Sequence, residues 1–408
     1  MSKKNNKKKK WIKPRHRVTR EIANLILKPY SYIKYGIRVE RFKEQEKRPY
    51  LVLYNHQTAF DQFFVGMAFR GSVYYLATED IFSNGFTSSL IRFLVAPIPI
   101  KKQTTDIKAI LNCLKVAKEG GTIAIAPEGN RTYSGRTEYM SPSIVPLAKK
   151  LGMPIALYRL EGGYGVHPRW SDVVRKGKMK GYVSKVIYPE EYLSMTDDEL
   201  FEAIKNELYV NEAVADREFR HKKSAEYLER AIYYCPNCNL STFESHCDII
   251  ECKKCGMKVR YLPTKALEGV GFDFPYRFVA DWYDAQAEFT SSLDVLQLKD
   301  EPIWRERAVL REEIPYKKKN VLCKDARLSL YGDRLEIEGE GVSLDLAFDG
   351  LQAITVLGKN KLNVYHNDKI YQIKGDKRFN ALKYVHIYHR YKNMIKGETD
   401  GKLQFLGL

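Results

Sequence analysis

The sequence predicts an α/β domain with a central, largely parallel sheet, then a small cysteine-rich unit, then a β-rich domain that ends in one helix. Three changes of pattern support this organisation: helical patterns alternate with short β-rich runs, two Cys pairs follow, and hairpin-like runs come last. The 408 residues are enough for several separate cores. We expect a basic tail at 1–20, the α/β domain at 21–231, the cysteine-rich unit at 232–262, a helical linker at 263–316 and the β-rich domain at 317–396.

The strands of the first domain are expected in short apolar runs, at 50–54, 73–77, 122–126 and 154–160. Helical patterns separate these runs, which is typical of parallel sheets because each crossover between parallel strands usually contains a helix. Thr196 followed by Glu199 is a helix-start signature, and Leu200, Ile204 and Leu208 then recur on one helical face.

Positive charge is concentrated at the start of the chain. The formal net charge is +18, and residues 1–20 contain seven Lys, three Arg and no acid, so the remainder carries +8. Such a Lys run does not fold by itself and is attracted to polyanions, either anionic lipid or nucleic acid. No apolar run reaches the roughly 18–20 residues of a spanning helix, and no signal-peptide pattern is visible. We therefore expect a cytoplasmic protein without a transmembrane helix, whose cysteines are reduced or bound to metal.

Two Cys pairs predict a zinc ribbon. Each pair has the spacing Cys-x2-Cys, thirteen residues separate the pairs, and Pro236 and Gly256 occupy positions typical of ribbon turns. The expected ligands of one tetrahedral Zn²⁺ are Cys235, Cys238, Cys252 and Cys255. The alternative is four unrelated buried thiols. A site closed by four sulfurs has no free coordination position, so this zinc would be structural, and we expect no catalytic metal or organic cofactor.

The C-terminal part shows two hairpin patterns. Alternating runs at 326–331 and 334–338 flank Gly332-Asp333, and runs at 362–366 and 369–373 flank Asn367-Asp368. A helical stripe follows, with Phe379, Leu382 and Val385 on one face. Hairpins closed by a single C-terminal helix resemble a pleckstrin-homology (PH) or GRAM-like domain in architecture, without a sequence motif.

A candidate catalytic pair follows the first expected strand. His56 and Asp61 are five residues apart and so do not share a helical face. They can meet if His56 lies on the turn and Asp61 in the first helical turn. The carboxylate would then accept a hydrogen bond from one ring nitrogen and leave the other free as a base. Taken alone, this spacing is more often structural than catalytic.

A second polar turn comes about seventy residues later, after the apolar run 123–126. Here Pro127 and Glu128 precede Gly129, which permits a positive φ or a close backbone approach. Arg131 then offers a planar fork that matches a phosphate group. Without His56, the turn would be interpreted as a loop whose arginine points to solvent.

Together, in this order and spacing, the two elements resemble the glycerophospholipid acyltransferase family, which includes the 1-acyl-sn-glycerol-3-phosphate (lysophosphatidic acid) acyltransferases. The family's Asn-His-x4-Asp block is matched by Asn55, His56 and Asp61. The resemblance extends over roughly residues 48–189, and it makes the domain at 21–231 an expected acyltransferase domain.

The other blocks of the family pattern are matched less completely. In the Phe-Pro-Glu-Gly-Thr-Arg block, residues 127–129 and Arg131 agree, whereas Ala126 replaces Phe and Asn130 replaces Thr. Lys101 stands where the family has an arginine at a strand end, and a lysine binds phosphate without the bidentate fork. The run 153–155 fits the final Pro-containing strand. The departures at Lys101 and Asn130 affect the predicted identity of the acceptor headgroup more than the predicted acyl-transfer reaction.

The resemblance implies direct acyl transfer from acyl-CoA or acyl-carrier protein to the free hydroxyl of 1-acylglycerol-3-phosphate, or of a related lysophospholipid, to form phosphatidic acid. His56 would be the general base, Asp61 would steady its imidazolium, and Lys101 and Arg131 would hold the acceptor phosphate. The full set of implied substrate-binding residues is Asn55, Lys101, Glu128, Gly129 and Arg131.

The substrates imply contact with an anionic membrane surface, and we expect a peripheral protein on the inner face. The basic tail and the amphipathic segment 22–37 are candidate attachments, although Pro29 should break or kink a helix there. The alternative is that this segment packs on the α/β core. The C-terminal domain could bind a headgroup or a protein.

Two other functions compete with the enzymatic interpretation. A basic zinc-ribbon protein could bind nucleic acid or act as a scaffold, but this leaves the polar turns around His56 and Arg131 without a role, so nucleic acid is not an expected partner. A catalytically inactive relative could serve as a lipid sensor.

Overall fold

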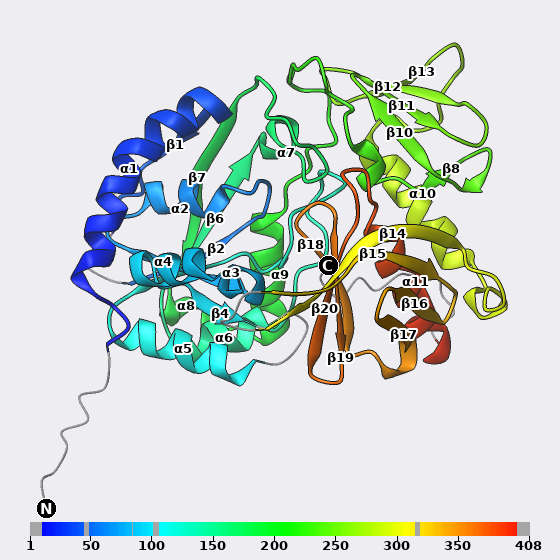
Figure 1. Ribbon diagram of the computed structural model, residues 1–408. Coiled ribbons are helices and arrows are strands. Elements are labelled where there is room, and N and C mark those ends of the chain that lie inside the picture. The colour runs from blue at the N-terminus through cyan, green and yellow to red at the C-terminus, as the bar shows by residue number, and fades with distance from the viewer. Residues whose placement is uncertain (1–9, 45–48, 84, 101–105, 315–318, 398–408) are drawn as a thin grey trace, which may run out of the picture.

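The computed structural model describes residues 10–44, 49–83, 85–100, 106–314 and 319–397. Lys101 and the first nine residues of the basic tail lie outside this description. Figure 1 shows an N-terminal α/β domain, a cysteine-rich β unit and a curled C-terminal sheet arranged around a common centre. This agrees with the fold class that the sequence predicts.

The first domain contains a mixed, mostly parallel sheet of seven strands in the order β1-β7-β6-β2-β5-β3-β4. The strands β6, β2, β5, β3 and β4 are mutually parallel, whereas β7 runs antiparallel to β6 and parallel to β1. The strands are β1 (Ile37–Val39), β2 (Leu51–Tyr54), β3 (Val73–Thr78), β4 (Ile98–Ile100), β5 (Thr122–Ile125), β6 (Ile155–Glu161) and β7 (Met179–Ile187).

Helices cover both faces of this sheet, which explains why its strands are apolar on both sides. On β2, Leu51 and Leu53 share one buried cluster with residues of α5, α6 and α9, while Val52 shares another with residues of α2. The helices are α1 (Pro14–Tyr35), α2 (Asp61–Ala68), α3 (Glu79–Phe82), α4 (Phe86–Leu94), α5 (Ile107–Lys118), α6 (Ile144–Leu151), α7 (Gly163–Val166), α8 (Pro189–Tyr192) and α9 (Asp197–Leu208). The expected start of α9 is confirmed, because Thr196 and Glu199 form a capping box.

The helix α1 continues through Pro29 from Pro14 to Tyr35, so Pro29 does not break it. Proline cannot donate a hydrogen bond to the carbonyl of Leu25. The Leu25 side chain is 78% exposed, so this turn lies at the surface, where water can satisfy the carbonyl. The alternative of packing on the core is wrong for most apolar residues of α1, which are exposed. None of the described helices combines the length and apolar character that a membrane crossing requires.

The cysteine-rich unit consists of a two-stranded hairpin and a four-stranded antiparallel sheet. Its strands are β8 (Tyr234–Cys235), β9 (Asn239–Leu240), β10 (Phe243–His246), β11 (Ile249–Cys252), β12 (Lys258–Tyr261) and β13 (Leu267–Gly269). The 3-10 turn η1 (Leu228–Arg230) precedes the unit, and the helix α10 (Val279–Ser292) follows it.

The C-terminal domain is a curled antiparallel sheet in the order β17-β16-β15-β14-β20-β19-β18, followed by the helix α11 (Leu382–Ile395). Both predicted hairpins are present as the pairs β15–β16 and β19–β20. The strands are β14 (Trp304–Glu313), β15 (Asn320–Leu330), β16 (Arg334–Gly339), β17 (Val342–Ala347), β18 (Ala353–Leu357), β19 (Lys361–His366) and β20 (Lys369–Lys374). The short turns η2 (Val295–Gln297) and η3 (Phe348–Gly350) complete the elements of this region.

The strand β14 lies within the range 263–316, for which a helical linker was expected. It is a central strand, paired with both β15 and β20. Charged residues such as Arg305, Glu306 and Arg307 obscure the alternation that would identify a strand.

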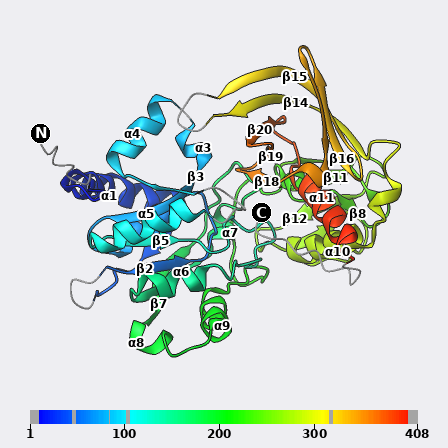
Figure 2. The same ribbon diagram turned by 90° about the horizontal axis from the view of Figure 1, so that it is seen from below.

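The three parts share one buried cluster. Tyr133 and Trp170 of the first domain lie in the same cluster as residues of the cysteine-rich unit and of the C-terminal sheet. The Trp170 and Tyr261 rings meet edge to face with centroids 5.6 Å apart. Figure 2 shows the turn after β18 beside the segment around α7. The C-terminal domain is therefore packed against the carboxyl end of the first sheet.

Replacing Ile204 by Ala tests the contribution of α9 to the first core. Ile204 is fully buried, so the substitution removes apolar contacts and leaves a cavity, and we expect a loss of about 2–5 kcal/mol in the free energy of unfolding. Urea denaturation measures this change. Asn206→Ala, at an exposed position on the same helix, should change stability by less than about 0.5 kcal/mol; equal losses in both variants would contradict the packing described.

Candidate active site

The turn between β2 and α2 brings His56 and Asp61 together. The Nδ1 atom of His56 lies 2.8 Å from Oδ2 of Asp61. The Asp61 carboxyl is fully buried, whereas 22% of the His56 side chain remains accessible. The predicted geometry, with His56 on the turn and Asp61 at the first helical residue, is therefore present.

The turn itself fixes the Asp61 carboxylate. Oδ2 accepts a hydrogen bond from the backbone N–H of Gln57 at 2.6 Å. Oδ1 accepts hydrogen bonds from the backbone N–H and the hydroxyl of Thr58, at 2.9 and 2.6 Å. These donors satisfy both oxygens of the buried carboxylate and fix its orientation. With an ionised Asp61 as its partner, Nδ1 of His56 carries the proton and Nε2 has its lone pair available.

The electrostatic surroundings favour neutral His56. Burial lowers the pKa of His56 below its usual value, and the nearby positive charges of Arg131 and Arg169 act in the same direction. The hydrogen bond and charge of Asp61 oppose this shift without cancelling it. A neutral imidazole at neutral pH is the form that can accept a proton.

Asn55 and Glu128 hold the turn in place. The Asn55 side chain donates to the carbonyl of Leu160 at 2.8 Å and accepts from the Leu160 N–H at 2.7 Å, so it extends the pairing of β2 with β6. Glu128 accepts the backbone N–H of His56 at 2.8 Å. Burial raises the pKa of Glu128 well above its usual value. Both side chains therefore help to fix the position of His56.

Arg131 projects from the turn after β5 into the same region. Gly129 has φ +70°, a conformation that allows the sharp turn before Arg131 and that other residues adopt with strain. The Arg131 residue is only 9% exposed, and its Nη1 finds no hydrogen-bond partner among the described residues. Burial and the neighbouring Arg169 lower the pKa of Arg131 to about 10, so it remains positively charged at neutral pH.

Two further cationic residues approach from elements that the sequence did not connect with the site. Arg169 donates to the carbonyl of Arg131 at 3.0 Å and to the carbonyl of Gly358, in the turn after β18, at 3.1 Å. From the same turn, Lys359 donates to the carbonyl of Ser171 and lies 2.9 Å from Oδ1 of Asp172. We call Arg131, Arg169 and Lys359 the cationic cluster.

The members of the cationic cluster are close enough to influence one another. Burial lowers the pKa of Lys359, and the charge of Arg131 contributes to this shift. Asp172 offsets part of the positive charge, and Arg230 and Lys359 together hold the pKa of Asp172 low, at about 2. The sequence analysis missed Arg169 and Lys359 because their contacts join distant segments. Gly358, next to Lys359, is 189 residues from Arg169, and no spacing pattern in the sequence predicts such a contact.

The four cysteines of the two pairs form a compact cluster. Their sulfur atoms all lie within 4.8 Å of one another, and Sγ of Cys235 is 3.7 Å from Sγ of Cys255. Sulfurs bound tetrahedrally to one Zn²⁺ at about 2.3 Å would be roughly 3.8 Å apart. Gly256, with φ +73°, forms the turn beside the second pair. The donor set and its spacing therefore fit a bound metal ion.

A protein-family model matches part of the first domain. Residues 36–157 match the protein-family model described as Acyltransferase. Over 163 residues the chain is 22% identical to 1-acyl-sn-glycerol-3-phosphate acyltransferase BAT2, chloroplastic, of Brassica napus. This alignment covers 39% of the present chain and 46% of the relative, so the chain spans about half the length of the curated relative that it matches.

A solved structure is similar to part of the chain. It is the 1-acyl-sn-glycerophosphate (LPA) acyltransferase PlsC from Thermotoga maritima, with a TM-score of 0.40 and 20% sequence identity. The alignment covers 48% of the present chain and 79% of that structure. Taken with the site geometry, the matching family model assigns the region around His56, Asp61 and Arg131 to an acyltransferase domain, related in sequence to a 1-acyl-sn-glycerol-3-phosphate acyltransferase.

Proposed function

We propose that this protein transfers a fatty acyl group from acyl-CoA or acyl-carrier protein to the free hydroxyl of a lysophospholipid. The first candidate acceptor is 1-acylglycerol-3-phosphate, which would give phosphatidic acid. The observation that carries the proposal is the 2.8 Å contact between His56 and Asp61 beside the buried Arg131. A base and an anion-binding group are then available together, as attack by a phosphate-bearing alcohol requires.

In the proposed reaction, Nε2 of His56 takes the proton of the acceptor hydroxyl as its oxygen attacks the thioester carbonyl. A new C–O bond forms and the C–S bond breaks. The imidazolium returns its proton to the departing thiolate, so His56 ends in its starting state. Asp61 keeps the imidazole oriented and stabilises its charged form. The transfer proceeds without an enzyme-bound acyl intermediate.

The acceptor phosphate is proposed to contact Arg131 and Lys359. Arg131 offers Nη1, which is without a hydrogen-bond partner in the described part of the chain, and a charge that persists at neutral pH. Lys359 adds a second charge from the C-terminal domain. Arg169 acts as a positioning residue, because its guanidinium is already held by carbonyl groups on both sides. Lys101 remains a proposed contact that lies outside the described residues, and Asn55, Glu128 and Gly129 are proposed to shape the pocket.

The setting of the reaction is proposed to be the inner face of an anionic membrane, with the protein bound peripherally. The exposed apolar residues of α1 support this proposal, because they offer a surface that can enter the headgroup region. The metal of the cysteine cluster is proposed to be Zn²⁺ in a structural role, held by Cys235, Cys238, Cys252 and Cys255. Four sulfur ligands favour zinc among the common divalent ions.

Replacing His56 by Ala should lower the rate of acyl transfer to 1-acylglycerol-3-phosphate by about 10²–10⁴-fold, because the general base is lost. The assay uses purified full-length protein, several lysolipids and both donor types. His221→Ala, at a partly exposed position outside the site, serves as the control and should retain activity. Wild-type turnover by the His56 variant would reject the mechanism, and no turnover by unchanged protein would favour an inactive lipid-sensing relative.

The pH dependence of kcat/KM should follow the protonation state of His56. Because burial places the pKa of His56 below 6.5, kcat/KM should be level near neutral pH and fall only as the pH drops through that lowered pKa. In Asp61→Asn the carboxylate no longer raises the pKa of His56, so the fall should move to still lower pH while the maximum rate decreases. A fall at the same pH in both proteins would show that the Asp61 charge does not act on the base.

Lys359→Gln should raise the KM for 1-acylglycerol-3-phosphate about tenfold to a hundredfold, because a charge-assisted hydrogen bond to phosphate is lost. The KM for monoacylglycerol, which lacks the phosphate, should stay unchanged. Lys369→Gln, at the exposed first residue of β20 in the same sheet, is the matched control. An equal rise for both acceptors would show that Lys359 does not contact the phosphate.

Elemental analysis should find about one zinc per chain. Cys252→Ser should lose the metal and lower the melting temperature, because metal binding stabilises a unit too small for a large core of its own. Cys247→Ser changes a neighbouring exposed thiol outside the cluster, so this variant should retain the metal. A folded protein without zinc, or equal metal loss in both variants, would reject the site.

A further inference from the structure

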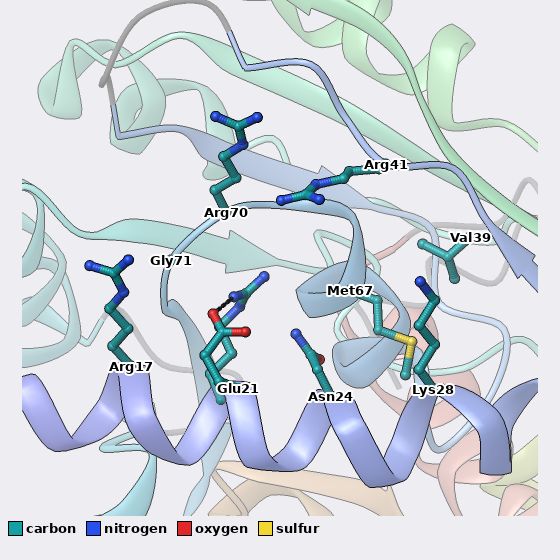
Figure 3. A pocket seen from close by; sticks show the side chains of 10 residues that line it. Arg17, Glu21, Asn24, Lys28, Val39, Arg41, Met67, Arg70 and Gly71 are labelled. Carbon is teal, nitrogen blue, oxygen red and sulfur yellow. Dashed lines mark hydrogen bonds and ion pairs between the residues drawn. The ribbon is translucent and has the colours of Figure 1, made fainter.

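A concave surface lies away from the candidate active site, between α1, the end of α2 and the segment after β1 (Figure 3). It is a pocket of about 310 Å³, and five of its ten lining residues are Arg or Lys. We call this hollow the α1 basic pocket. Its cations are Arg17, Arg20, Lys28, Arg41 and Arg70. None of the residues assigned to acyl transfer lines this pocket.

The positive charge of the α1 basic pocket is poorly balanced. Arg20 pairs with Glu21 at 2.5 Å and donates to the carbonyl of Gly66 at 3.3 Å. Within the described part of the chain, the side chains of the other four cations form no ion pair, although the Glu44 carboxylate accepts the backbone N–H of Arg70. In Figure 3, the guanidinium groups of Arg41 and Arg70 lie above α1, and Arg17 and Lys28 rise from the helix on either side. Unpaired cations around one hollow repel one another, and a bound anion would remove this cost.

The neighbouring face of α1 is exposed and apolar. Val18, Ile22 and Leu25 each follow a pocket-lining residue of α1 by one position, which is about 100° around a helix. The apolar stripe of α1 comprises Val18, Ile22, Leu25, Ile26 and Ile33, with exposed fractions between 56% and 81%.

The helix α4 extends this apolar surface. Its Phe86 is 82% exposed and its Phe93 is 54% exposed. Arg15 of α1 ties the two helices together, since its Nε donates to the carbonyl of Phe93 at 2.8 Å. Neighbouring exposed apolar side chains of this kind are typical of an interaction site.

We infer that the α1 basic pocket binds the phosphate of an anionic phospholipid in a bilayer, while the apolar stripe of α1 enters the headgroup boundary beside it. A lipid fits better than a soluble anion because the stripe also needs an apolar environment. Long Arg and Lys side chains can reach from a buried helix to headgroup phosphates. This site is distinct from the acceptor site at Arg131 and holds a lipid that does not react.

Such binding would bring the membrane surface to the candidate active site. At the end of α1, the Tyr35 ring lies 5.1 Å from the ring of Phe60, measured between centroids. Phe60 directly precedes Asp61 at the start of α2. A lipid-bound α1 would therefore place the mouth of the His56 site next to the bilayer.

The inference is tested by sedimentation of the full-length protein with vesicles of phosphatidylcholine, with or without phosphatidylglycerol. The double substitution Arg41→Gln and Arg70→Gln should weaken binding to the phosphatidylglycerol vesicles about tenfold or more, since each Lys or Arg near an anionic surface contributes on the order of fivefold. The matched control removes the same charge from the C-terminal sheet through Lys369→Gln and Lys374→Gln. We expect the control to bind within about twofold of the unchanged protein.

Two further measurements separate the possible ligands. Leu25→Glu should weaken binding to both vesicle types, because it places a charge in the apolar stripe. Inorganic phosphate should displace the protein no better than chloride at the same ionic strength. If both double substitutions weakened vesicle binding equally, general charge attraction would explain the binding, and the inference would be overturned. Selective displacement by phosphate would assign the pocket to a free anion and overturn it as well. Neither result depends on acyl transfer.

Discussion

The hydrogen bond between His56 and Asp61 depends on how firmly the carboxylate is held. Three donors from the turn bind the Asp61 carboxylate in addition to the imidazole. They are the N–H groups of Gln57 and Thr58 and the Thr58 hydroxyl. This arrangement satisfies the oxygens of a fully buried carboxylate and gives it one direction in which to receive Nδ1–H. The ring orientation and the position of the free nitrogen both follow from that single constraint.

The sequence predicts those features of the structure that depend on fixed spacings between nearby residues. The pair His56 and Asp61 was identified from a five-residue interval across a turn and a helix start. The two Cys pairs and both hairpin turns were likewise readable, because each needs particular residues at fixed separations. The strand β14 escaped detection because charged residues mask its alternation. Arg169 and Lys359 could not have been found, since their contacts join segments 187–189 residues apart.

The C-terminal sheet is therefore a structural part of the candidate active site. Arg169 is held by carbonyl groups from both domains, and Lys359 reaches from the turn after β18 to Asp172 of the first domain. The sequence suggested a separate domain that recruits a headgroup or a protein. The structure adds a direct contact, because Gly358 and Lys359 of this turn bind Arg169 and Asp172 beside the candidate site.

The buried cluster that the three parts share also limits how the molecule can be divided. Trp170 has no exposed surface, and its cover comes partly from Tyr261 of the cysteine-rich unit. A fragment that ended at residue 231 would leave this indole and the neighbouring Tyr133 uncovered. Uncovered aromatic surface drives self-association. A first domain produced without the other two parts would consequently be aggregation-prone.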